Sequence, residues 1–289
     1  MFALTQPRSR PYLALLLGIL SLGASGIFVS LANAPGIVTG FYRVGIATLV
    51  LAYPFWRRRA ILGTASRRAL LMALLGGLFF AGDLAFWNTG VLISGPTIPT
   101  FMGNTAPIWV ALGAMIFFRE RLGRRFWLGL LVAMTGVAIL MGVDAFNQVG
   151  LGAFFGLLAG IFYGAYFLVM QRSRQEMDAI SSFWLAAATS TLFLLLAALL
   201  LRQPLTGYST FTYLNFAALG LLVQVVGQLV INFALGYLPA SLVAPTLLAQ
   251  PLLTALLSTL LLGESFTWLQ VVGGAAVLAG VYLVHRSRG

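Results

Sequence analysis

The chain has 289 residues, of which 60% are hydrophobic and only 8% are charged. Soluble domains carry roughly 25% charged residues, so this composition excludes a water-soluble globular protein and indicates that lipid is the main solvent. The net charge of +11 comes from arginine, because the sequence has no lysine. The arginines form short clusters between long apolar runs, a pattern typical of cytoplasmic loops and not of a nucleic-acid-binding surface.

The inventory of reactive residues argues against an enzyme. The chain has no cysteine and no lysine, and its single histidine, His285, lies near the C-terminus. A Ser-His-Asp triad, a histidine metal site and a P-loop ATPase are therefore not credible. We expect no catalytic residues, no metal and no cofactor.

A helix needs about 20 apolar residues to cross the hydrocarbon core. Apolar runs of this length, separated by short turns, predict an all-α membrane protein with ten transmembrane helices. The triplet Ala32-Asn33-Ala34 resembles a signal-peptide cleavage site, but the run before it has spanning length, so we interpret that run as the first span. The ten predicted spans cover residues 11–32, 36–56, 68–92, 96–118, 123–142, 149–171, 180–201, 211–236, 239–262 and 266–285.

The arginines predict the orientation of these spans. If ten spans alternate in direction, fifteen of the 17 arginines fall in loops on one side, Arg202 falls on the other, and Arg43 lies inside the second span. Positive loops stay in the cytoplasm, so we predict that both termini are cytoplasmic.

The sequence also repeats itself. A shift of 144 residues aligns five pairs, and a shift of 138 residues aligns Gly18 with Gly156 and Gly26 with Gly164. We therefore predict two five-helix repeats, residues 1–145 and 146–289, which are inverted because five is odd. Inverted repeats are typical of secondary transporters, which bind substrate near the membrane midplane between the two halves. The five pairs are Asn88 with Asn232, Pro107 with Pro251, Glu120 with Glu264, Gly129 with Gly273, and Gly136 with Gly280.

The residues around Glu120 and Glu264 resemble a signature of the drug/metabolite transporter superfamily. The stretch Leu262-Gly263-Glu264-Ser265-Phe266, with the two glycines after it, is close to that pattern, whereas the first copy has Phe118-Arg119 where glycine is usual. Arg43 also lies where many members carry an arginine. The chain resembles ten-span members of the EamA type over its whole length, and among them exporters of the YddG type.

This resemblance implies a bacterial inner-membrane exporter of amino acids, aromatic and other neutral ones, that works by alternating access. Two alternatives stay open, namely export of drugs or other small metabolites and passive, channel-like facilitation. The expected partners are a small-molecule substrate and the lipid bilayer.

Charged residues inside spans are expensive and mark function by default. Arg43 and Asp83 are such residues, and they lie at similar predicted depths. In one interpretation Asp83 binds a substrate amine or a proton, and Arg43 steers a carboxylate. In the other, the two charges form an ion pair that holds the second and third spans together.

Polar and aromatic side chains within spans are the other candidates for substrate binding. Gln224, Gln228 and Asn232 recur every four residues, which places them on one helix face, where they line a cavity or join helices. Asn88, the repeat equivalent of Asn232, is a candidate for the same cavity. The aromatic candidates, which either form a pocket or pack the core, are Tyr42, Phe79, Trp87, Tyr163, Tyr166 and Trp184.

Two repeat-equivalent prolines, Pro107 and Pro251, lie near the middle of the fourth and ninth spans. Proline weakens a helix locally. We expect these positions to act as hinges, or to be kinks that the bundle tolerates.

Overall fold

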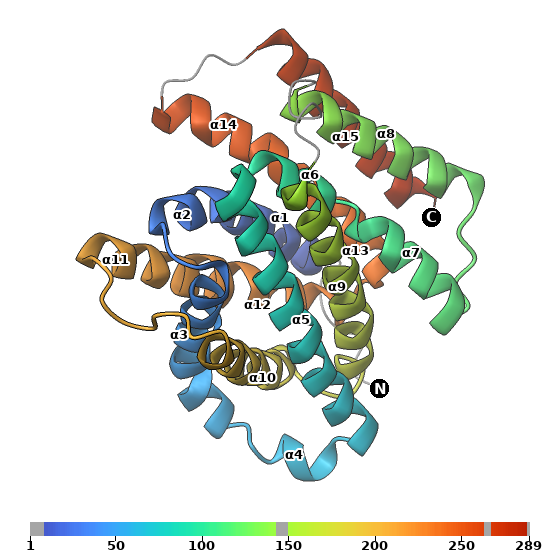
Figure 1. The fold of residues 1–289 in the computed structure, drawn as a ribbon. Helices are drawn as coiled ribbons and strands as arrows, with labels where there is room; N and C mark the ends of the chain where they lie inside the picture. Colours follow the sequence, from blue (N-terminus) through green and yellow to red (C-terminus); the bar gives the residue numbers. More distant parts are fainter. Residues whose placement is uncertain (1–8, 143–149, 263–266, 288–289) are drawn as a thin grey trace.

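The computed structural model describes residues 9–142, 150–262 and 267–287, and all regular secondary structure within these ranges is helical. Figure 1 shows the helices as one bundle. Glu264 and the predicted boundary between residues 145 and 146 lie outside the described residues. The elements are α1 Ser9–Gly23, α2 Ser25–Ala32, α3 Gly36–Trp56, α4 Ile61–Thr64, α5 Arg67–Ser94, α6 Thr97–Gly103, α7 Ala106–Phe117, α8 Arg124–Met141, α9 Leu151–Ser173, α10 Ala179–Leu200, α11 Thr210–Ala218, the π-helix η2 Leu219–Gln228, α12 Leu229–Ala234, α13 Ala240–Thr246, the 3-10 turn η3 Leu247–Ala249, α14 Gln250–Leu262 and α15 Trp268–Arg286.

Nine segments of the described chain are long and apolar enough to cross a bilayer, and each coincides with a predicted span. The remaining predicted span, residues 239–262, is helical along α13, η3 and α14. Its apolar stretch over Ala240–Leu256 is shorter than the others. The all-helical membrane fold is thus confirmed, and nine of the ten predicted spans meet the length and hydropathy expected of a crossing helix.

Two spans are broken at equivalent places in the repeats. The fourth divides between α6 and α7 at Asn104 and Thr105, and the ninth divides at η3, 144 residues later. Pro107 and Pro251 each occupy the second residue of the half-helix that follows, where a missing N–H costs little. The prolines therefore begin new half-helices after a break and do not bend a continuous helix.

Helices α8 and α15 pack through four glycines that leave no room for a side chain. A Cβ atom on Gly136 would lie 2.6 Å from the carbonyl oxygen of Gly273, and one on Gly129 would lie 2.8 Å from that of Gly280. The early part of α8 thus meets the late part of α15, so the helices are antiparallel, and they lie side by side in Figure 1. Each contact has its symmetry mate, because replacing both residue numbers by those of their repeat equivalents gives the other contact of the pair. A two-fold axis between inverted repeats requires this relation.

The connections rich in arginine interlock at one end of the bundle. The backbone N–H and the hydroxyl of Ser66 both donate to the carboxylate of Glu176 at 2.9 Å, and these bonds lower the pKa of Glu176. Arg58 lies 3.9 Å from Asp178 in the same region. The α3–α5 and α9–α10 connections are therefore on one side, as the alternating spans predict.

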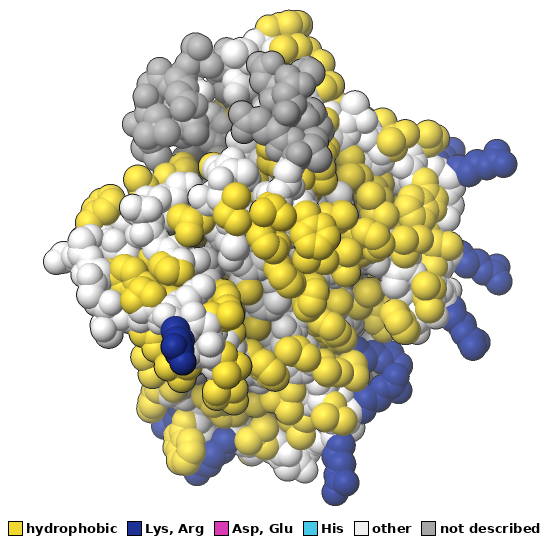
Figure 2. Space-filling model, viewed as in Figure 1, with side chains coloured by type: hydrophobic (Ala, Val, Ile, Leu, Met, Phe, Trp, Pro, Cys, Tyr) yellow, Lys and Arg dark blue, Asp and Glu magenta, His cyan; other side chains and the backbone are white. Residues whose placement is uncertain are grey.

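The outer surface suits lipid. Large apolar side chains are exposed along α1, α5, α10 and α15. Figure 2 shows apolar side chains across most of the visible face, with most basic side chains along its right and lower edges. A soluble protein seldom exposes apolar patches of this extent, so the surface fits the hydrocarbon core of a bilayer.

The close packing of α8 on α15 makes a testable prediction. Substituting Gly136→Ala places a Cβ atom 2.6 Å from backbone atoms of α15, so the helices must separate. We expect a loss of roughly 1–3 kcal/mol in stability, measured as thermal unfolding of the detergent-solubilised protein. Gly63→Ala is the control, because nothing lies within 4 Å of a Cβ atom there. Equal unfolding of the two variants would contradict the packing argument.

Candidate functional site

A cavity of about 620 Å³ lies within the bundle. It extends to the ends of α2 and α8 and to the starts of α6 and α15, which lie opposite the arginine-rich connections. Small-molecule sites occupy about 300–1,000 Å³, so the cavity has the size of a substrate site. Its position between the two repeats is where inverted-repeat transporters hold their substrates.

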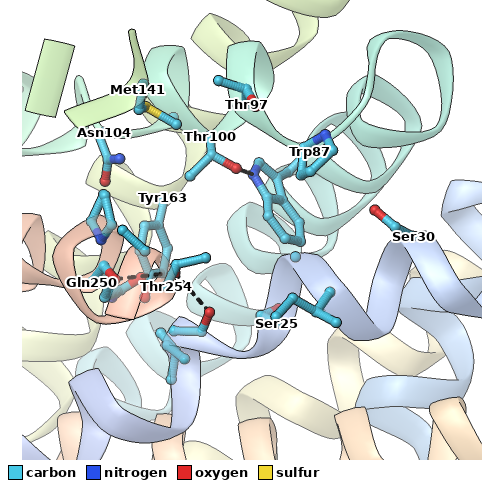
Figure 3. A pocket seen from close by; sticks show the side chains of 18 of the residues that line it. Ser25, Ser30, Trp87, Thr97, Thr100, Asn104, Met141, Tyr163, Gln250 and Thr254 are labelled. Carbon is cyan, nitrogen blue, oxygen red and sulfur yellow. Dashed lines mark hydrogen bonds between the residues drawn. The ribbon is translucent and has the colours of Figure 1, made fainter. Parts of the chain in front are cut away.

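Helix breaks supply much of the polar lining. The α1–α2 junction, the break between α6 and α7, and the start of α14 all border the cavity. At the first of these, the hydroxyl of Thr254 donates to the carbonyl oxygen of Gly23 at 2.8 Å, which satisfies a backbone group that the break exposes. Figure 3 shows Thr97, Thr100 and Asn104 on one wall, with Ser25, Gln250 and Thr254 on the wall opposite.

Asp83 projects from α5 into this cavity and is partly exposed there. Within the described residues, its carboxylate makes no hydrogen bond and no ion pair within 4.0 Å. Arg43 lines the same cavity, but its guanidinium donates to the hydroxyl of Ser25 at 3.1 Å and to Oε1 of Gln224 at 3.4 Å. The two intramembrane charges therefore share a cavity without a direct salt bridge.

Two buried side chains at the cavity carry N–H groups without a partner. Arg43 is only 4% exposed, and its Nε has no hydrogen-bond partner among the described residues. Gln228 is 1% exposed; its Oε1 accepts from the hydroxyl of Tyr163 at 3.3 Å, while its Nε2 has no partner in the same part of the chain. An unsatisfied buried donor costs about 1–3 kcal/mol, so these positions favour an acceptor supplied by a ligand or by water.

The three amide residues Gln224, Gln228 and Asn232, on η2 and α12, have different roles. All three side chains are buried, and only Gln228 lines the cavity. Gln224 accepts from Arg43, and Asn232 donates to the carbonyl oxygen of Ala179 at 3.0 Å and to the hydroxyl of Ser182 at 2.9 Å. Two of the three amides therefore hold neighbouring helices.

Asn88 is also fully buried, and it donates to the carbonyl oxygen of Gly36 at 3.1 Å. Asn88 and Asn232 thus make the same kind of contact, each with the start of another helix, and neither lines this cavity. A polar stripe in a sequence does not distinguish such a helix contact from a binding surface.

The aromatic candidates also divide. Trp87 and Tyr163 line the cavity, and Nε1 of Trp87 donates to Oγ1 of Thr100 at 3.3 Å, as Figure 3 shows. Tyr166 lies behind them, fully buried, and stacks on the cavity-lining Phe80 with ring centroids 4.8 Å apart. Trp87, Tyr163 and Phe80 therefore form the aromatic part of the wall.

The other three aromatic candidates pack away from the cavity. Tyr42 stacks on Phe216 with ring centroids 4.5 Å apart, and Trp184 stacks on Phe55 at 3.9 Å. Phe79 meets Phe162 edge to face at 6.1 Å. Pro251 lines the cavity, whereas Pro107 is buried in α7 and does not.

Sequence reasoning missed most of the polar residues that border the cavity. They come from spans that the apolar pattern treats as uninterrupted, and the signal that marks them is a polar residue beside a helix break. Asn104 and Gln250 are such residues, because each lies within three residues of the repeated proline. The missed polar residues are Ser25, Ser30, Thr97, Thr100, Asn104, Gln250, Thr254 and Gln270.

Comparison with known proteins agrees with this architecture. A protein of Salmonella typhimurium named "Probable amino-acid metabolite efflux pump" is 28% identical, over 96% of this chain and 94% of that protein. The "Uncharacterized transporter YdfC" of Bacillus subtilis is 27% identical, over 73% of this chain and 70% of that protein. A crystal structure of a protein shares the fold, with a TM-score of 0.80 and 17% identity over 98% of this chain and 100% of that chain.

The EamA-like transporter family matches the chain twice, over residues 9–142 and again over residues 150–286. The two matches cover nearly the whole chain and agree with the predicted two-repeat organisation. This multi-pass membrane protein therefore belongs to the EamA-like transporter family of the drug/metabolite transporter superfamily.

Proposed function

We propose that this transporter exports amino acids, aromatic and other neutral ones, across the bacterial inner membrane by alternating access. The observation that carries the proposal is the set of polar groups left without partners around one cavity. These groups are the carboxylate of Asp83 and the N–H donors of Arg43 and Gln228. We also propose the orientation that the arginines predict, in which both termini and the arginine-rich connections face the cytoplasm.

An amino acid complements these groups with its own charges. Its ammonium group donates hydrogen bonds, which the carboxylate of Asp83 accepts, and its carboxylate accepts from the Nε of Arg43 and the Nε2 of Gln228. Hydrogen bonds to charged groups are roughly twice as strong as those between neutral groups. Binding of a zwitterion thus satisfies donors and an acceptor that the protein alone leaves open.

The cavity wall suits a substrate with an apolar or aromatic side chain. The indole of Trp87 is held by Thr100, and the phenol of Tyr163 is held by Gln228, so both rings have fixed orientations. Phe80 adds a third aromatic surface. Aromatic faces bind apolar side chains and stack on rings, which favours neutral over charged amino acids.

The two repeats provide the basis for alternating access. The shift of 144 residues relates α6 in the first repeat to α13 in the second. Thr97, Thr100 and Gly103 of α6 line the cavity, whereas α13 lines none of it and its residues 240–245 are buried. Equivalent half-helices are thus open in one repeat and closed in the other, and exchange of their conformations opens the cavity to the opposite side. This arrangement favours a carrier over a channel.

A substrate panel in proteoliposomes tests the proposed function. We expect saturable counterflow of aromatic or other neutral amino acids, because a carrier exchanges labelled substrate on one side for unlabelled substrate on the other through a single binding site. Labelled phenylalanine, leucine, serine, lysine and a lipophilic cation are compared, with and without a pH gradient. Non-saturable flux without counterflow would support a channel, and transport of the lipophilic cation alone would support drug export; either result contradicts the proposal.

Substitution of Asp83 tests the proposed ammonium site. Asp83→Asn keeps the size of the side chain but removes the charge, so the substrate amine loses a charge-assisted hydrogen bond. We expect the apparent KM to rise roughly tenfold or more, measured as the concentration dependence of counterflow. Glu176→Gln is the control, because Glu176 is an exposed carboxylate that does not line the cavity, and the amide oxygen of glutamine can still accept a hydrogen bond from Ser66. An unchanged KM in folded Asp83→Asn protein would remove Asp83 from the binding site.

A further inference from the structure

The half-helix α13 separates the cavity from the arginine-rich end of the bundle. The cavity reaches α14, where Gln250 and Thr254 line it, but it touches no residue of α13. Val243 and Ala244 of α13 belong to the same buried apolar cluster as Val110 of α7. Figure 1 shows α13 beside α7 and α9. For the cavity to open toward this end, α13 must move.

Two side chains from distant parts of the chain hold the start of α13. Oε1 of Gln171, near the end of α9, accepts from the backbone N–H of Ala240 at 2.7 Å. Oε2 of Glu120, in the connection between α7 and α8, accepts from the hydroxyl of Ser241 at 2.6 Å. A carboxylate acceptor makes the second bond stronger than a neutral one. These contacts add polar restraints to the apolar packing of α13 on α7 and α9.

The other end of α13 is joined to α14 only by the single 3-10 turn η3. Pro245 lies before this turn and Pro251 lies after it, so the helical hydrogen-bond ladder is interrupted on both sides. Hinges in transporters and enzymes are often such positions, where a few residues absorb the change in backbone angles. α13 can therefore turn on η3 while α14 keeps its place.

The repeat-equivalent half-helix α6 lies at the open end of the cavity; Glu264, the equivalent of Glu120, lies outside the described residues. Thr97 of α6 is the equivalent of Ser241, and it lines the open cavity. The two equivalent hydroxyls thus have different surroundings in one structure, since Ser241 is fully buried and bound to Glu120. Within the described residues, the hydroxyl of the closed half-helix is bound to a carboxylate, and the equivalent hydroxyl of α6 faces the cavity.

We propose that Glu120 and Gln171 form a latch that holds α13 closed while the cavity is open at the opposite end. The latch rests on the proposed alternating access and adds the residues that set the balance between its two states. Its hydrogen bonds exist only in the state with α13 closed. Weakening them therefore raises the population of the state that is open toward the arginine-rich face.

The absence of cysteine from the sequence allows a direct test by single-cysteine labelling of the full chain in membrane vesicles. Ala244→Cys reports opening of α13, because Ala244 is 2% exposed and is the equivalent of the cavity residue Thr100. Thr97→Cys reports the opposite end of the cavity. The probe is a membrane-impermeant maleimide added to the arginine-rich face for the first reporter and to the opposite face for the second.

We expect Ser241→Ala to raise the labelling rate of Ala244→Cys about tenfold, since a hydrogen bond to a charged group is lost from the closed state alone. Labelling of Thr97→Cys should fall in the same background. Gln171→Met removes the second acceptor with little change in size and should act in the same direction. Gln171→Met is the test variant if Ser241→Ala does not fold.

Ser190→Ala is the matched control, because it removes a buried serine bond of 2.7 Å, to the carbonyl oxygen of Gly77, far from α13. Ser241→Thr keeps a hydroxyl and should keep labelling slow. Equal labelling of Ala244→Cys in the Ser241→Ala, Gln171→Met and Ser190→Ala backgrounds would overturn the latch. The labelling readout needs no substrate, so it is independent of the counterflow experiment. Absence of amino-acid counterflow would contradict the proposed function, whereas unchanged labelling would contradict only the latch.

Discussion

The requirement that backbone and side-chain polar groups find partners without help from water governs this structure. In lipid an unsatisfied group costs several kcal/mol, so chain breaks occur only where protein or a cavity receives the exposed groups. The α1–α2 junction illustrates this rule, because Thr254 from a distant helix donates to the carbonyl oxygen of Gly23. The breaks between α6 and α7 and at η3 follow it too, as both border the cavity or buried neighbours.

The same requirement, taken together with the position of the cavity, distinguishes structural from candidate functional polar residues. The side-chain amides of Asn88 and Asn232 donate hydrogen bonds to the first residues of neighbouring helices, which fixes the positions of those helices. Oδ1 of Asn88 and Oδ1 of Asn232 have no partner within the described residues, but neither residue lines the cavity. Asp83, Arg43 and Gln228 combine an unpaired group with a place in the cavity lining. A ligand can complete an unpaired polar group only where a cavity admits it, so unmet hydrogen bonds at the cavity lining are the guide to the proposed substrate site.

The repeat adds a second argument, because two similar sequences adopt different local states. The antiparallel contact between α8 and α15 is alike in both directions, with glycines exchanged for their equivalents. The half-helices α6 and α13 are not alike, since one borders the cavity and the other is packed and held by Gln171 and Glu120. Symmetry in the scaffold with asymmetry in the half-helices is what a carrier open to one side at a time requires.

The spans, their alternation and the repeat follow from the sequence because each depends on local pattern: apolar length against bilayer thickness, arginine placement, and matching residues at a constant shift. The site does not follow in this way. Gln228 and Asn232 share a helix face and a residue class, yet only Gln228 reaches the cavity, and Arg43 meets Gln224 across 181 residues of chain. Which buried polar group is paired and which is left for a ligand depends on long-range packing, and a pattern along one helix carries no information about its neighbours.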